Sequence, residues 1–185
     1  MLSSDSVLSA SSIDFYFKLL LKISTDRKEV GIYNEILLLS PDFLSVSDKE
    51  SGLFGKDPFC FDLVFMPFMF ENQWVLVVLD NRSMVVKKGY SYLRYYSLTQ
   101  FTSVPSFVNE VRLRLMSDYV KRFSSEKNQS VVSPKMLITY DLFDSFPYFS
   151  DLFICSVARS FVFGKVFSCS CDILILKNEL LSDFD

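Results

Sequence analysis

The sequence predicts an α+β domain, in which helices flank a small mixed sheet. Three observations predict it. Apolar residues recur at helical spacing through 13–23, an unbroken apolar run of strand-like residues fills 73–79, and a second strongly apolar stretch of helical length fills 152–163. The expected order is α, mixed β, α, β, α, α, without the regular alternation of a parallel α/β fold. The length of 185 residues suits one domain, residues 1–185.

The first helix is expected to start at a capping-box-like pair, Ser11 and Asp14. It should end near the polar residues 25–28. Its apolar face is expected to hold Ile13, Tyr16, Phe17, Leu20 and Ile23. The segment Val30–Leu44 is apolar and indicates neither helix nor strand, and the glycine- and charge-containing segment Ser45–Pro58 is expected to be a loop.

A β region is expected between residues 61 and 98. Residues 61–66 form a candidate strand that Pro67 should end, because proline cannot donate a ladder hydrogen bond. Residues 73–79 read as a strand buried on both faces. Asp80, Asn81, Arg82 and Ser83 are expected to form a hairpin turn. Less regular strand segments should complete the hairpin at residues 84–87 and 93–98.

Helices dominate the second half of the expected fold. Pro105 should open a helix that runs to about Phe123. Its apolar side is expected to hold Val108, Val111, Leu115, Tyr119 and Val120. After a strand at residues 135–140, Ser150 or Asp151 should cap an apolar helix over 152–163 that Gly164 ends. A final amphipathic helix is expected over 172–181.

Charge and composition narrow the partners and the compartment. The net charge of −3 gives no basic surplus for a phosphate backbone, so no direct nucleic-acid partner is expected. No apolar run is long enough to span a bilayer, and no secretory signal is recognisable at the N-terminus, so no membrane association is expected. The interpretation is an intracellular protein, nuclear or cytoplasmic, whose four cysteines are free thiols.

The chemistry-bearing residues exclude most enzyme classes. The chain has no histidine, which excludes the standard histidine-using cysteine, serine and metal-dependent hydrolases. Cys169 and Cys171 form the only close cysteine pair, which is weak support for a zinc site, so no metal or cofactor is expected. No glycine-rich phosphate loop and no nucleophile elbow occur. The carboxylates Asp141, Asp144 and Glu179 are expected to be solvated or capping groups.

The hydrophobic content favours a protein partner. Half of the residues are hydrophobic, and 20 are phenylalanine, which is more than a core of this size readily buries. Three contact surfaces are expected in decreasing order. They are Val30–Leu44, the aromatic stretch Phe143–Phe149, and the last helix with Ile173, Leu176, Leu180 and Leu181.

Four local patterns follow one another within residues 7–165. The most specific one joins Phe61–Pro67 to Gln73–Asp80, a strand with a proline and then a polar residue, a tryptophan and an apolar run ending in aspartate. The other three patterns are Val7-Leu8 with Ile13–Tyr16, then Tyr95–Leu98, then Ser150–Ile154. Taken in their order along the chain, the four patterns resemble the ubiquitin-like-protein-specific (SUMO) cysteine proteases. The resemblance implies a Ulp/SENP-like adenain fold, a papain-like cysteine protease architecture.

The resemblance also implies that the catalytic groups have been replaced. The family uses a cysteine nucleophile, a histidine base, an aspartate that orients it and a glutamine at the oxyanion. Here the histidine position is Gln73, the aspartate position is Tyr96 and the cysteine position is Leu152. The stretch Asp144–Pro147, where the glutamine should lie, contains none. Cys155 follows Leu152 by one helical turn but has no base to activate it. The chain therefore resembles a catalytically inactive member, a pseudoenzyme.

Two binding roles stay open, with an enzyme using a wholly different site as a distant third. One is a scaffold subunit in an obligate hetero-complex, and the other is a non-cleaving binder of SUMO or another ubiquitin-like modifier. In the family, an aromatic lid covers the modifier's tail; Trp74 retains one lid residue and Val7 replaces the other. Trp74 is better explained as a large core residue beside a buried strand. The candidate contact residues are Trp74, Val7, Phe146, Tyr148 and Phe149.

Overall fold

The structure is a computed structural model that describes residues 8–26, 34–41, 43, 56–82, 90–98, 101, 103–123, 135–140 and 150–164. The elements within these ranges are α1 (Ala10–Asp26), β1 (Ile36–Leu38), the 3-10 turn η2 (Pro58–Cys60), β2 (Leu63–Phe70), β3 (Gln73–Asp80), β4 (Tyr90–Tyr96), α2 (Ser106–Phe123), β5 (Lys135–Tyr140) and α3 (Ser150–Phe163). The expected α+β class is confirmed.

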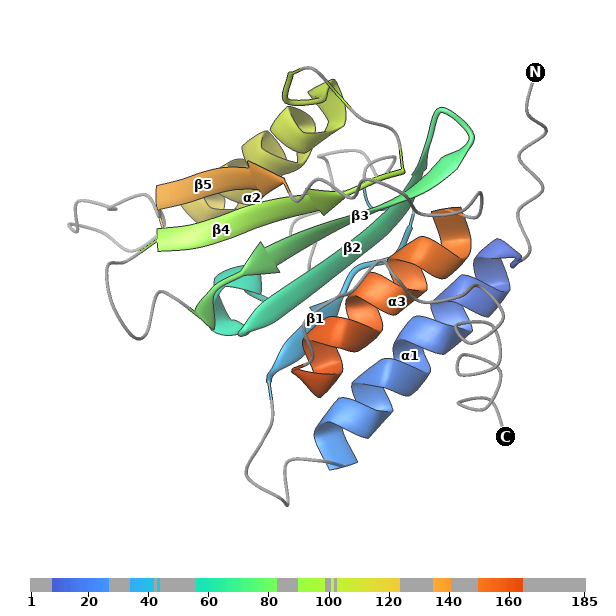
Figure 1. The fold of residues 1–185 in the computed structure, drawn as a ribbon. Helices are drawn as coiled ribbons and strands as arrows, with labels where there is room; N and C mark the ends of the chain where they lie inside the picture. Colours follow the sequence, from blue (N-terminus) through green and yellow to red (C-terminus); the bar gives the residue numbers. More distant parts are fainter. Residues whose placement is uncertain are drawn as a thin grey trace.

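The five strands form one mixed sheet in the order β1-β2-β3-β4-β5. The inner pairs β2/β3 and β3/β4 are antiparallel, and the outer pairs β1/β2 and β4/β5 are parallel. Helices α1 and α3 lie side by side on one face of this sheet, and α2 covers the other face near β4 and β5 (Figure 1). The result is a three-layer arrangement with a separate apolar core on each face of the sheet.

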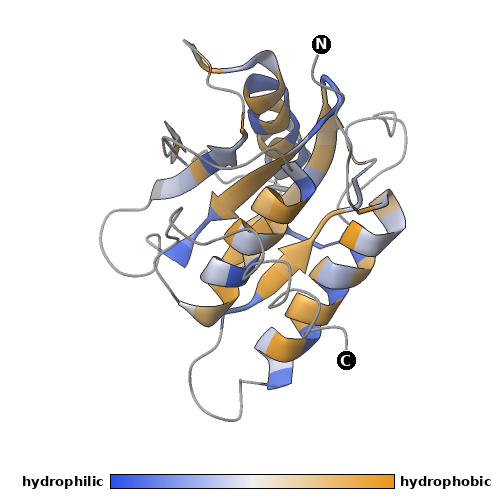
Figure 2. Cartoon of the chain, turned by 45° about the vertical axis from the view of Figure 1, so that its right-hand side comes forward, coloured by the Kyte–Doolittle hydropathy of each residue, from blue (hydrophilic) through white to orange (hydrophobic). Residues whose placement is uncertain are grey.

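Strand β3 is the centre of both cores. Seven of its eight residues are buried, as its unbroken apolar sequence predicts. Alternate side chains enter opposite cores: Trp74, Leu76 and Val78 meet α1 and α3, while Val75, Val77 and Leu79 lie on the side of α2. Figure 2 shows the hydrophobic colours concentrated on the central strands and on α3.

The first helix begins before the expected cap. Helix α1 starts at Ala10, and the Ser9 hydroxyl accepts the backbone N–H of Ser12 at 3.1 Å, so Ser9 and not Ser11 is the N-cap. Asp14 instead pairs with Lys18 one turn later, at 2.6 Å. The apolar face is confirmed, with Ile13, Tyr16, Phe17 and Leu20 buried and Ile23 partly buried.

The expectation that Pro67 ends its strand is wrong, because β2 continues through Pro67 to Phe70. Leu63 and Phe65 exchange backbone hydrogen bonds with the β1 side, through Glu35 and Leu39. Pro67 follows Leu63 and Phe65 at alternate positions of β2, so its nitrogen also points toward the β1 side. β1 ends at Leu38, opposite Phe65, and so does not pair with β2 at Pro67. A proline at such a position removes no ladder hydrogen bond.

A tight turn that the sequence analysis missed joins β2 to β3. Phe70 pairs with Gln73, so the turn consists of Glu71 and Asn72, both with positive φ (47° and 61°). Two positive φ angles are typical of the type I′ hairpin turn, whose twist matches that of the strands. The available signal was Asn72, since asparagine tolerates the left-handed region better than most residues.

The predicted hairpin turn at residues 80–83 is wrong in form. Asp80 still belongs to β3, and Asn81 is buried instead of exposed in a turn. The Asn81 amide donates to the carbonyls of Pro58 and Phe61 (3.1 and 2.8 Å) and accepts the Ser91 hydroxyl at 2.6 Å. These buried bonds make it a structural anchor. The segment expected as a strand at residues 84–87 lies outside the described residues.

The remaining helices agree with the sequence except at one position. Helix α2 buries Val108, Val111 and Leu115 as expected, but Val120 is 47% exposed. Position 120 lies on the helix face that points away from the sheet, so the apolar character of the residue did not decide its burial. Helix α3 is almost wholly buried, and Gly164 follows it with a φ of 65°, the left-handed conformation of a helix stop.

The described part of the first expected contact surface is largely packed against the rest of the chain. Ile36 and Leu38 of β1 pack against the core on the α1 side, and Leu39 and Phe43 are buried in the other core. This part of Val30–Leu44 forms the edge of the sheet, where the residues of β1 are half-buried. The parallel pairing with β2 explains the burial, because it places the segment between both helical layers.

Candidate functional site

The start of β3 and the start of α3 lie together, and they carry Gln73 and Leu152, two of the positions that the sequence resemblance singles out. The backbone N–H of Trp74 donates to the Ser150 hydroxyl at 2.9 Å. This bond joins residues that are 76 positions apart in the chain and fixes the first turn of α3 against the sheet. Two of the four sequence patterns therefore meet at one place in the structure.

Asp151 ties a third segment to the same place. Its carboxylate is fully buried and accepts the N–H of Leu8 at 2.6 Å and the N–H of Leu152 at 2.9 Å. An anion is favoured here because the N-terminus of a helix presents unpaired N–H groups and the positive end of the helix dipole. The chain just before α1 is thereby held over the start of α3.

Leu152, which the sequence resemblance puts at the cysteine position, is a core residue. It is 4% exposed and belongs to the same apolar cluster as Trp74, which is 3% exposed. Leu8 packs against this cluster from outside. An aliphatic side chain in this environment offers neither a nucleophile nor a hydrogen-bonding group. The burial of Trp74 agrees with its interpretation as a core residue.

Tyr96, which the sequence resemblance puts at the aspartate position, belongs to this cluster too. It pairs with Leu76 in the sheet register, and its ring lies 5.9 Å from that of Phe161, in the last turns of α3. Gln73 is half-buried at the first residue of β3, and strand alternation directs it to the face opposite Trp74. Trp74, Tyr96 and Leu152 therefore share one core. Gln73 is the residue next to Trp74 in the strand, and its side chain is directed to the other face of the sheet.

Cys155 lacks the features of a reactive cysteine. It is fully buried on α3, and burial together with the nearby Asp151 carboxylate raises the pKa of its thiol well above the ordinary value. A reactive cysteine requires the opposite, a lowered pKa and access to substrate. Cys155 and the exposed Cys60 are both free thiols, as expected.

Several expected site residues lie outside the described residues. They are Val7, Phe146, Tyr148 and Phe149, the stretch Asp144–Pro147, the carboxylates Asp141 and Glu179, the pair Cys169 and Cys171, and the contact surfaces Phe143–Phe149 and residues 172–181. Of the two expected lid residues, Val7 and Trp74, only Trp74 lies within the described residues.

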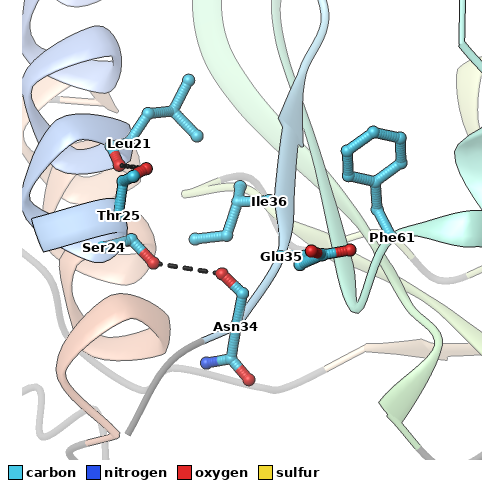
Figure 3. Close-up of a pocket in the computed structure, with 7 residues that line it drawn as sticks. All are labelled: Leu21, Ser24, Thr25, Asn34, Glu35, Ile36 and Phe61. Carbon is cyan, nitrogen blue, oxygen red and sulfur yellow. Dashed lines mark hydrogen bonds between the residues drawn. The ribbon is translucent and has the colours of Figure 1, made fainter. Parts of the chain in front are cut away.

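A pocket that the sequence analysis did not foresee lies at the other end of α1 (Figure 3). It has a volume of about 480 Å³ and is lined by Leu21, Ser24, Thr25, Asn34, Glu35, Ile36 and Phe61. The Ser24 hydroxyl donates to the Asn34 carbonyl at 3.1 Å, which joins α1 to the start of β1. Its lining comes from three separate stretches of chain, so no local pattern could reveal it.

The pocket offers little chemistry. Its side chains supply hydroxyl, amide and carboxylate groups, and Thr25 already donates to the Leu21 carbonyl at 2.9 Å. Glu35 is its one ionisable residue, so the lining contains no acid–base pair.

No helix in the described parts of the chain is long and apolar enough to cross a membrane.

Comparison with known proteins identifies the fold. No family model and no curated protein sequence matches the chain. A de-sumoylating protease is similar over 96% of this chain and 67% of its own, with a TM-score of 0.65 at 14% identity. The catalytic domain of a Ulp1-like SUMO protease from Chaetomium thermophilum is similar over 99% of this chain and 72% of its own, with a TM-score of 0.61 at 11% identity.

A third solved structure shows the yeast Ulp1 protease domain in complex with SMT3, the yeast ortholog of SUMO. It covers 96% of this chain and 77% of its own, with a TM-score of 0.56 at 13% identity. Likeness across most of the chain at such low identity establishes a shared fold and leaves function to the site itself. The expected Ulp/SENP-like fold is confirmed.

Proposed function

We propose that this chain, which has the Ulp/SENP-like fold of the SUMO proteases, is a catalytically inactive domain that works as a protein-binding scaffold subunit of an intracellular multiprotein complex. The single observation that carries the proposal is Leu152. It fills the position of the family's nucleophile at the start of α3 and packs, 4% exposed, into the core beside Trp74. A leucine cannot attack a carbonyl carbon.

The groups around Leu152 support the same conclusion. Nucleophilic catalysis by cysteine needs a base or a lowered pKa, and the chain has no histidine. The neutral amide of Gln73 has no lone pair basic enough to accept a proton near neutral pH. The thiol nearest to Leu152 along the chain, that of Cys155, is fully buried and has a raised pKa. An inactive domain can retain a complete fold because binding surfaces are independent of catalytic groups.

The absence of activity is tested with SUMO precursors and with a SUMO probe that carries a C-terminal electrophile. We expect neither cleavage nor labelling, with an active SUMO protease as the positive control. Leu152→Cys restores the family's nucleophile without its base, so this matched variant should also be inactive. Time-dependent, thiol-specific turnover by the wild-type chain that disappears in Cys155→Ala would refute the proposal.

The complex-forming role is tested by the behaviour of the isolated chain. Large apolar side chains are exposed on all three layers, including Phe15 on α1 (55%), Leu113 on α2 (63%) and Leu137 on β5 (43%). We expect the chain to self-associate or aggregate when expressed alone and to become monodisperse with its partner. A chain that stays monomeric at high concentration and binds no apolar dye contradicts this role.

A second candidate is a non-cleaving binder of SUMO or another ubiquitin-like modifier. It is favoured by the likeness to a protease domain solved in complex with a SUMO ortholog. The burial of Trp74 weighs against a tail-binding tunnel beside that residue. Titration of the chain with SUMO and with ubiquitin by calorimetry decides between the candidates. Saturable binding to a modifier by the monomeric chain would place the second candidate first.

A further inference from the structure

The pocket between the end of α1 and the start of β1 has the size of a small-ligand site. Its volume of about 480 Å³ lies within the range of about 300–1,000 Å³ that is usual for such sites. Leu21, Ile36 and Phe61 supply apolar walls, and Ser24 and Thr25 in the last turns of α1 add hydroxyl groups (Figure 3). The pocket is separate from the start of α3, which lies at the opposite end of α1.

The two hydroxyl groups of the pocket can only accept hydrogen bonds from a ligand. Ser24 Oγ donates its hydrogen to the Asn34 carbonyl at 3.1 Å, and Thr25 Oγ1 donates its hydrogen to the Leu21 carbonyl at 2.9 Å. A hydroxyl has one hydrogen and two lone pairs, so acceptor capacity is what remains once the hydrogen is bonded. Among the side chains that line the pocket, the Asn34 amide is then the one donor. The pocket therefore favours a ligand group that is rich in donors.

The surroundings of the hydroxyls favour a cation over an anion. They lie at the C-terminal end of a helix of 17 residues, which is the negative end of the helix dipole. No basic residue occurs in the last turn of α1, and none is among the described residues that line the pocket. Glu35 has contacts elsewhere in the chain, so its carboxylate serves here only to disfavour an anion. Arg27 and Lys28 follow α1 in the sequence and lie outside the described residues.

Neighbouring acceptors beside apolar walls fit a planar cation on an apolar stem. A guanidinium group has five N–H donors in a rigid fork and no acceptor, which suits the hydroxyls of Ser24 and Thr25. It is also less strongly hydrated than an ammonium group, so it enters a partly apolar pocket at a lower cost. The methylene stem of an arginine can lie along apolar surface such as that of Ile36 and Phe61.

We propose that this pocket binds a guanidinium group whose N–H groups donate to Ser24 Oγ and Thr25 Oγ1 at the negative end of α1. The group is carried either by an arginine side chain of another protein or by a small free guanidine, and both sources offer the same chemistry. The inference goes beyond the proposed function, because it involves neither Leu152 nor any other group at the start of α3.

The test measures binding to the full chain by saturation-transfer NMR, which detects weak ligands of both monomeric and associated proteins. The ligands are arginine and citrulline, each with acetyl and methylamide blocking groups. Citrulline has a neutral urea in place of the guanidinium, so it lacks the charge and replaces a donor with an acceptor. We expect the blocked arginine to bind saturably and the blocked citrulline to bind about tenfold more weakly.

A further ligand and two variants complete the test. Agmatine carries the guanidinium without a peptide backbone, so binding of agmatine alone assigns the site to a free guanidine, and binding of the blocked arginine assigns it to a protein side chain. Thr25→Val keeps the shape of an exposed residue, removes Oγ1 and should weaken guanidinium binding about tenfold. The matched control is Thr139→Val on β5, at the opposite edge of the sheet from β1, which should leave binding unchanged. Circular dichroism checks that both variants keep the wild-type helix content.

The proposal is overturned if neither blocked arginine nor agmatine binds, if citrulline binds as tightly as arginine, or if Thr25→Val binds like wild type. Binding that appears only when Arg27→Gln is combined with Lys28→Gln would show that a cation of the chain itself fills the pocket, which also overturns it. Cleavage of a SUMO precursor would instead refute the proposed function and leave the guanidinium site in place.

Discussion

Replacing Leu152 with aspartate places a second carboxylate next to the buried Asp151, in the core shared with Trp74. Leu152 is 4% exposed, so the substitution first loses the packing of a buried leucine, about 2–5 kcal/mol in large-to-small replacements. It also buries a charge without a partner, which costs several kcal/mol more or forces its protonation. The sum is on the order of 5 kcal/mol or more, comparable to the whole stability of an ordinary domain.

The matched control is Leu113→Asp, the same change at a leucine that is 63% exposed. It should cost less than about 1 kcal/mol, mostly through lower helix propensity. Leu152→Cys, which removes volume without adding charge, should cost about 1–3 kcal/mol.

Urea denaturation followed by the fluorescence of Trp74, the only tryptophan, reports all three variants. We expect Leu152→Asp to be unfolded without urea, Leu113→Asp to match wild type and Leu152→Cys to lie between. A folded Leu152→Asp protein with a wild-type midpoint would refute the placement of Leu152 in the core, and with it the argument that the nucleophile position has become structural.

Three other predictions follow from the contacts. Because the pKa of Cys155 is raised in the folded state, the thiol of the unfolded chain loses its proton first as the pH rises. The free energy of unfolding should therefore fall above about pH 8.5. Urea midpoints measured across pH should show a smaller fall for Cys155→Ala than for wild type. Asn81→Ala leaves two backbone carbonyls and a hydroxyl without their partner and should cost about 3 kcal/mol, whereas an unchanged thermal midpoint would contradict its role as an anchor. Replacing Glu71-Asn72 with Asn-Gly relieves two positive φ angles and should stabilise the chain by about 1 kcal/mol, and a loss of stability in the same denaturation assay would show that the turn is not of this type.

Elements whose signals are local were predictable from the sequence. The apolar face of α1, the buried strand β3 and the start of α2 after Pro105 all depend on residues within a few positions of one another. Helix α3, with Gly164 as its stop, follows in the same way. The resemblance of four short patterns to the SUMO proteases then supplied the order in which these elements are assembled, and the comparison of folds confirmed it.

Errors arose where a neighbour in space decided the outcome. Pro67 is tolerated in β2 because β1 ends before reaching it, and strand pairing is not visible in the local sequence. Asparagine is typical of turns, but the side-chain amide of Asn81 hydrogen-bonds to Pro58, Phe61 and Ser91, which are distant in the chain. Val120 is apolar and exposed because α2 meets the sheet on one side only.

The difference between what the sequence determined and what the tertiary structure determined is clearest around Leu152. Which groups are missing is a matter of composition, so the sequence by itself determined that no histidine is present and that Leu152 is not a nucleophile. Only the tertiary structure decided what surrounds Leu152. The bond from Trp74 to Ser150 and the bond from Leu8 to Asp151 bring three distant stretches together, and the apolar residues they carry close into a core. Long-range contacts of this kind depend on how the chain folds back on itself, because each partner satisfies a group that its own neighbours in sequence cannot reach.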